Sequence, residues 1–221
     1  MSDYDDLLDP VPTPINADLV EQILRAKHGE PNKYASYWEL DEEDVDEATE
    51  EQVKNDPAVR ILWAAEHGRL DIIKELYDTD HSLLMTRDKD GYTPLHRASY
   101  NDHVEVAQYL LDHGADTEAK TLDGWTPLHS AANWGNARLA SVLLRRGANV
   151  NAQTNGKQTA LHLAASNSDS RETLELLLMA PFVDHTLRNT LGETAKQMAE
   201  RTCKYHYLFE IADDAVNQIT S

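Results

Sequence analysis

Three regularly spaced histidines, His96, His129 and His162, are the residues of this chain whose type and pattern best suit chemistry. Imidazole nitrogens bind metal ions and transfer protons, so a row of them could form a metal site or a proton relay. The histidines occupy equivalent places in a repeated block, and stacked helical units lie about 10 Å apart. A metal ion needs each ligand atom within roughly 2 Å. We therefore interpret the histidines as groups that hydrogen-bond backbone atoms between neighbouring units.

Other catalytic chemistries lack a motif. The sequence contains no nucleophile elbow, phosphate-binding loop or glycine-rich nucleotide fingerprint. Cys203 is the only cysteine, which excludes an internal disulfide and a cysteine-based metal site and fits a reducing compartment. Beside Lys204 it could be an activated thiol, but a plain thiol is the simpler interpretation. The sequence predicts a protein that is not an enzyme and holds no cofactor or metal ion.

The histidines belong to a block that occurs three times in succession, at residues 90–98, 123–131 and 156–164. The threonine of each block follows the previous threonine after 33 residues. A degenerate copy places Thr194 35 residues further on, and we assign the two extra residues to the polar stretch 167–170. An altered copy also lies upstream of the first block. This self-similarity predicts five stacked units, of which the first and last are caps.

Each block has the chemistry of a helix start. Thr93 and Thr126 suit an N-cap, and the proline after each threonine suits the first helical position. A second helix is predicted after each block, at residues 104–111, 137–144 and 173–178. Gly114 and Gly147 suit left-handed helix stops, and the Asp-Gly pairs suit tight turns.

This pattern resembles the ankyrin-repeat family between about Asp56 and Ile211. The resemblance implies an all-α ankyrin-repeat solenoid of helix-turn-helix units with β-hairpin tips. An acidic, largely disordered N-terminal arm is expected to precede the solenoid. The predicted segments are an acidic flexible arm at 1–55 with a short helix at 17–28, units at 56–88, 89–121, 122–154, 155–188 and 189–212, and a tail at 213–221.

The whole chain of 221 residues carries a net charge of −19. Most of this negative charge lies at its N-terminal end. Residues 1–56 hold 17 acidic and 4 basic side chains, against 22 and 16 in residues 57–221. This field repels nucleic-acid phosphates and favours basic protein partners. The N-terminus lacks the basic start of a signal peptide, and the longest apolar stretch is too short to span a membrane. We expect no direct binding to nucleic acid or membrane.

Aromatic, charged and polar residues that the repeat does not require are the candidate protein-binding residues. Some lie at a predicted hairpin tip, and others follow the buried alanines of a first helix, where they would face a concave surface. Exposed Trp, Tyr and Arg over adjacent units are typical of interface hot spots. The predicted protein-binding residues are Tyr92, Arg97, Tyr100, Asn101, Trp125, Asn133 and Trp134, with Arg87 and Lys120 on the same rim. Trp63 is instead expected to pack against the neighbouring hairpin.

The acidic arm leaves two interpretations open. Nine of the thirteen residues from Glu39 to Glu51 are acidic, and Trp38 precedes them. The arm could be a solvated tail whose aromatic residues rest on the first unit. It could also be a partner-binding segment of the activation-domain type.

A narrower resemblance within the ankyrin family is carried by Trp38, residues 62–66, Trp134 and residues 205–211. It implies a small nuclear protein that promotes transcription through partner binding, without catalytic activity. The alternative is a cytosolic adaptor or assembly chaperone that shields a basic partner with its acidic arm, and its affinity would fall steeply with salt. A capped solenoid is usually monomeric, so we expect a monomer.

Overall fold

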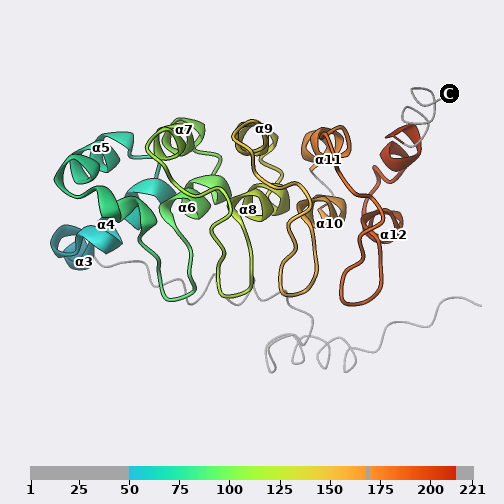
Figure 1. Cartoon of the computed structure of the whole chain (residues 1–221), viewed down its shortest axis with the longest axis horizontal. Coiled ribbons are helices and arrows are strands. Elements are labelled where there is room, and N and C mark those ends of the chain that lie inside the picture. The colour runs from blue at the N-terminus through green and yellow to red at the C-terminus, as the bar shows by residue number, and fades with distance from the viewer. Residues whose placement is uncertain (1–49, 168–169, 213–221) are drawn as a thin grey trace, which may run out of the picture. The chain divides into compact units, whose positions relative to one another are not determined.

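The computed structural model describes residues 50–167 and 170–212. Within these ranges the helices form pairs, with one inner and one outer helix in each unit, and hairpin loops join successive units (Figure 1). The short helix predicted at 17–28, most of the acidic run and the tail at 213–221 lie outside the described residues. The predicted all-helical repeat architecture is confirmed.

Two rows of helices run through the described units, as Figure 1 shows. The inner helices are α4 (Pro57–Glu66), α6 (Pro94–Tyr100), α8 (Pro127–Asn133), α10 (Ala160–Ser166) and α12 (Ala195–Thr202). The outer helices are α5 (Leu70–Thr79), α7 (Val104–Asp112), α9 (Ala137–Arg145) and α11 (Arg171–Leu178). Each helix contacts the next helix of its own row, so the apolar faces of successive units join into one core.

The ends of the repeat carry additional helices. Helix α3 (Glu50–Asn55) precedes α4 and packs against it, although it falls within the stretch 1–55 that was expected to be a flexible arm. A short 3-10 helix, η1 (His81–Met85), follows α5. Residues 207–212 form a last helix, which buries Phe209 and closes the C-terminal end of the repeat.

Capping boxes explain where the inner helices begin. In α6 the hydroxyl of Thr93 accepts a hydrogen bond from the backbone N–H of His96, and Nδ1 of His96 accepts one from the backbone N–H of Thr93. Helices α8, α10 and α12 begin with the same reciprocal pair. The carboxylate of Asp56 caps α4 by accepting from the N–H of Ala58 at 2.8 Å. The threonine caps and first-turn prolines predicted from the sequence are confirmed.

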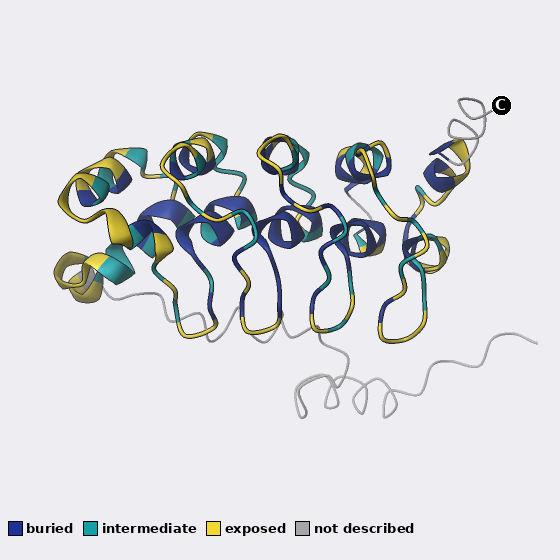
Figure 2. Ribbon diagram, in the orientation of Figure 1, coloured by how far each residue is buried: buried dark blue, intermediate teal, exposed yellow. Residues whose placement is uncertain are grey.

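The core is built from small and branched apolar residues where the two rows face each other (Figure 2). Equivalent alanines of the inner helices are fully buried, which allows the helices to approach closely. These alanines are Ala64, Ala98, Ala131 and Ala164. Leu95, Leu128 and Leu161 of the repeated block are also buried. Each inner helix therefore buries the apolar face that the spacing predicts.

The hairpin loops are tight turns rather than strands. Within the described residues, β-type backbone pairing is limited to an isolated antiparallel bridge between Arg188 and Thr194. Neighbouring tips are nevertheless joined, because the N–H of Leu122 donates to Asp90 O at 2.8 Å and that of Asn155 donates to Asp123 O at 2.9 Å. The predicted hairpin tips are present, and backbone hydrogen bonds link each one to the next.

The two extra residues of the fourth unit lie in two places, which corrects the assignment of both to residues 167–170. The residue before α11, Ser170, lies 11 positions after Thr159, whereas His103 and Asn136 before α7 and α9 lie 10 positions after their threonines. One extra residue therefore precedes α11. The second lies in the loop after α11, where Phe182 adopts a left-handed conformation with φ of 64°.

Gly124 is expected to be the more sensitive of two glycines with similar backbone angles. Its φ is +77°, and a Cβ there would lie 2.8 Å from Oδ1 and 3.0 Å from the backbone N of Asn155. Gly147, with φ of +87°, has nothing within 4 Å of the same position. Both alanine variants carry the left-handed strain, about 1 kcal/mol, but Gly124→Ala must also displace the neighbouring tip. In chemical denaturation, Gly124→Ala should lower the free energy of unfolding by roughly 1 to 3 kcal/mol more than Gly147→Ala does. Equal losses for the two variants would contradict close contact between the hairpin tips.

Candidate protein-binding site

The repeated histidines hold neighbouring units together. Nδ1 of His129 accepts from the N–H of Thr126, so Nε2 carries the proton and donates to the carbonyl of Ala152 at the end of its own unit and to that of Gln158 in the next unit, both at 3.1 Å. His96 and His162 make the same forward bond, to Trp125 O at 3.1 Å and Glu193 O at 3.2 Å. The structural interpretation of the histidines is confirmed.

Burial keeps these imidazoles neutral. Loss of solvation lowers the pKa of His96 and of His129 to about 4, and it also lowers the pKa of His162. Both ring nitrogens of each histidine are already engaged in hydrogen bonds within the fold. The Nδ1 lone pair and the Nε2 proton of each histidine are therefore both used within the fold, which leaves neither nitrogen available to bind a metal ion or to relay a proton near neutral pH.

Tyr100 and Trp134 form the aromatic centre of the candidate site. Tyr100 is the last residue of α6, and Trp134 is the C-cap of α8, so both side chains lie where an inner helix ends. Their ring centroids are 4.6 Å apart at an interplanar angle of 55°. Trp134 retains 40% of its surface exposed. The structure thus brings two predicted binding residues from adjacent units into contact.

Arg97 joins the rest of this surface. Its guanidinium bonds the carboxylate of Asp88 at 2.7 Å, lies 3.8 Å from that of Glu66 and lies over the ring of Tyr92 at 5.2 Å. The carboxamide of Asn101 donates to Arg97 O at 3.3 Å. Because Arg97 and Tyr100 are three positions apart on α6, they are neighbours on the helix surface.

We call the resulting surface the aromatic site. It extends over the first three units and combines an aromatic pair with a paired arginine. Its members are Tyr92, Arg97, Tyr100, Asn101 and Trp134, with the carboxylates of Glu66 and Asp88. The arrangement supplies apolar contact area, hydrogen-bonding groups and charge, but no nucleophile beside a base. It is suited to binding rather than to bond-breaking chemistry.

Three further predicted residues lie beside the aromatic site or have structural roles. Arg87 is largely occupied by the backbone, since its guanidinium donates to Gly91 O at 3.0 Å and to Lys120 O at 2.6 Å. Lys120 is exposed. Asn133 is half-buried, and its carbonyl accepts from the carboxamide of Asn167 at 2.7 Å. Arg87 and Asn133 therefore connect neighbouring units.

The expectation that Trp125 is an exposed binding residue is wrong. Only 7% of its surface is exposed. The backbone N–H of Trp125 donates to the hydroxyl of Thr121 at 3.1 Å, and its backbone carbonyl accepts from Nε2 of His96 in the preceding unit. Stacking against its neighbours buries the indole, so it stabilises the hairpin and the junction of two units instead of meeting a partner. Trp63, by comparison, is half-buried and stacks on His67 with ring centroids 4.4 Å apart.

The sequence reasoning missed Glu66 and Asp88. Asp88 accepts from the N–H of Tyr92 at 2.8 Å in addition to pairing with Arg97. The sequence does contain a pattern that could have identified Asp88. A short polar side chain recurs five positions before each capping threonine, and in each case it binds the backbone of the hairpin. These residues are Asp88, Thr121, Thr154 and Asn189. Glu66 shows no comparable repetition.

Two family models match the repeats. One, described as ankyrin repeats in many copies, matches residues 61–111, and another, described as ankyrin repeats in three copies, matches residues 116–189. The chain belongs to the ankyrin-repeat family. Ankyrin repeats typically serve as interaction domains without enzymatic activity, and neither match is to a catalytic family. The family assignment agrees with an aromatic site that lacks a nucleophile.

Curated relatives extend this ankyrin assignment over most of the chain. Ankyrin repeat domain-containing protein 49 of Homo sapiens is 59% identical over 168 residues, which cover 76% of this chain and 70% of that protein. The Bos taurus protein of the same name is 58% identical over 184 residues, covering 80% and 77%. The Drosophila melanogaster protein of that name is 36% identical over 120 residues, covering 52% and 50%.

The described part of this ankyrin-repeat protein shows neither a metal-binding cluster nor a membrane-spanning helix. Its His, Cys, Asp and Glu side chains form no group of three that could hold a metal ion. None of its described helices combines the length and apolar character needed to cross a bilayer. Cys203 is buried near the C-terminal end, as expected for a plain thiol.

Proposed function

We propose that this ankyrin-repeat protein recruits a partner protein through the aromatic site, on the concave side of the repeat, and acts in the nucleus as a co-regulator that promotes transcription. The contact between Tyr100 and the exposed Trp134, across two units, is the observation that supports the binding role. Trp, Tyr and Arg dominate the binding energy of many interfaces. The nuclear and transcriptional part rests on the narrower sequence resemblance.

The partner is expected to match both parts of the aromatic site. The Tyr100–Trp134 pair, with its rings inclined at 55°, offers an apolar surface for an aliphatic or aromatic side chain. The two negative charges of Glu66 and Asp88 exceed the single positive charge of Arg97, so the adjacent surface favours a basic residue. A partner segment with an apolar anchor next to Lys or Arg would satisfy both, and the acidic character of the whole chain would favour its approach.

Removing both aromatic side chains is expected to abolish partner binding while leaving the fold intact. The full chain and its Tyr100→Ala/Trp134→Ala variant would be compared in affinity capture from nuclear and cytosolic extracts, followed by mass spectrometry. A discrete nuclear partner should lose about 2 kcal/mol or more of binding energy, roughly 30-fold in affinity. Tyr207→Ala is the matched control, because Tyr207 has 39% of its surface exposed at the far end of the repeat.

The same experiment separates the two functions. If the double variant alone loses the partner, and a transcriptional reporter loses activation with it, the co-regulator proposal stands. If all three proteins capture the same basic proteins and release them in moderate salt, the acidic segment is responsible. That result would reject the aromatic site and favour a cytosolic adaptor or assembly chaperone.

A further inference from the structure

The outer surface of α9 is basic, in contrast to the acidic chain around it. Helix α9 (sequence ARLASVLLR) contains Arg138 and Arg145 and no acidic residue, and Arg146 is its C-cap. Arg146 pairs with Asp112 of α7. Arg138 and Arg145 are exposed, and within residues 50–167 and 170–212 neither has an ion-pair or hydrogen-bond partner. Two unpaired arginines therefore face outward on the side of the repeat formed by the outer helices.

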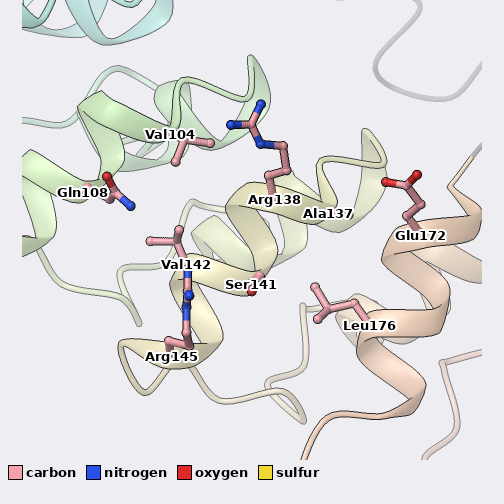
Figure 3. Close-up of a pocket in the computed structure, with 9 residues that line it drawn as sticks. All are labelled: Val104, Gln108, Ala137, Arg138, Ser141, Val142, Arg145, Glu172 and Leu176. Atoms are coloured by element: carbon pink, nitrogen blue, oxygen red, sulfur yellow. The ribbon is translucent and has the colours of Figure 1, made fainter.

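These arginines border an open cleft that crosses three outer helices (Figure 3). The cleft has a volume of about 500 Å³ and includes Val104 of α7, Val142 of α9 and Leu176 of α11 among its lining residues. Figure 3 shows Arg138 and Arg145 towards opposite ends of α9, with Val142 between them. Val142 thus lies between two cationic groups, and Val104 and Leu176 on the flanking helices add apolar lining, an arrangement that complements an amphipathic acidic segment.

The spacing of the arginines defines the ligand further. Seven residues in an α-helix correspond to two turns, or about 10 Å along the axis. Each guanidinium can bind one carboxylate through two parallel hydrogen bonds. We propose that this α9 cleft binds an acidic amphipathic helix of a partner protein, with two carboxylates two turns apart and apolar residues between them.

The negative net charge of the chain does not prevent such binding. At physiological ionic strength the Debye length is about 8 Å, so charges beyond the cleft are largely screened. Within the cleft Arg138 and Arg145 outnumber the one acidic lining residue, Glu172 of α11. The bound helix would place its carboxylates towards α9 and a neutral or basic residue towards Glu172. A helix lying in a groove with apolar anchors on one face is a common mode of peptide recognition.

The test is fluorescence anisotropy with a synthetic amphipathic helix that has two glutamates seven positions apart and leucines between them. The full chain should bind this probe saturably at about 0.15 M salt. Arg138→Glu together with Arg145→Glu should weaken binding about tenfold or more, because two attractions become repulsions. The control is Lys74→Glu with Lys204→Glu, which makes the same change in charge at two other exposed positions.

Three results would overturn the proposal. They are a failure of the full chain to bind saturably, equal weakening by the two charge-matched variants, and tighter probe binding after residues 41–44 are changed to Asn and Gln in the full chain. The last result would show that the acidic segment of this chain, rather than a partner, occupies the cleft. Tyr100→Ala/Trp134→Ala should bind the probe normally, so failure of the aromatic site and failure of the cleft are distinguishable.

Discussion

Replacing Trp125 with alanine is expected to lower the free energy of unfolding by about 3 to 5 kcal/mol, as for other large buried aromatic residues. Only 7% of the surface of Trp125 is exposed. Removal of its indole leaves a cavity beside the hairpin at residues 121–125, close to the bond from His96 Nε2 to the Trp125 carbonyl. The loss should appear in urea denaturation followed by circular dichroism.

Trp134→Ala is the matched control, since it removes the same type of side chain from the C-cap of α8 in the same unit, where 40% of the residue is exposed. Trp134→Ala should lower the free energy of unfolding by no more than about 1 kcal/mol, as for most exposed positions. Similar losses for the two variants would contradict the buried placement of Trp125. Partner binding should show the opposite order, with Trp134→Ala the more damaging substitution under conditions where both variants are folded.

The helix starts could be predicted because their determinants are local. A capping threonine, a proline at the first helical position and a histidine at the third lie within one turn, and their roles do not depend on the rest of the chain. The period of 33 residues then fixes how units follow one another. Tyr100 and Trp134 could be placed for the same reason, because both follow the last buried alanine of an inner helix.

Trp125 could not be placed in this way. The position before the capping threonine is held by Tyr92, Trp125, Gln158 and Glu193 in successive units. Tyr92 and Gln158 are half-buried there, whereas Trp125 is buried. Burial at this position depends on packing between consecutive hairpins, which composition and periodicity do not encode. Helix α3 was missed because its residues continue an acidic run, and only its packing against α4 accounts for it.

Acid is expected to destabilise the repeat through its buried histidines. His96 and His129 have a pKa of about 4 in the folded chain, against 6.5 for an unperturbed imidazole. The unfolded chain therefore takes up protons at a higher pH than the folded chain. The contribution of each neutral histidine to the free energy of unfolding is complete above about pH 6.5. It falls as the pH drops to about 4 and then levels off, with a total loss of about 3 kcal/mol per histidine.

His129→Gln isolates this contribution, and the chain itself supplies the precedent. In α12 the third position of the capping box is Gln197, whose side chain accepts from the N–H of Thr194 at 3.0 Å. Glutamine should therefore preserve the cap of α8 but lose the bonds from Nε2 to the next unit. At pH 7 the variant should lose about 1 to 2 kcal/mol.

Between pH 7 and pH 5 the variant should lose about 2 kcal/mol less stability than the parent chain, because one titrating group is gone. Urea denaturation at the two pH values measures this difference. Comparing the two proteins also removes the opposing effect of the carboxylates, whose mutual repulsion weakens as they are protonated in both. An unchanged pH dependence would show that His129 is accessible to protons in the folded state. The expected result would show that the groups joining consecutive units also make the repeat sensitive to acid.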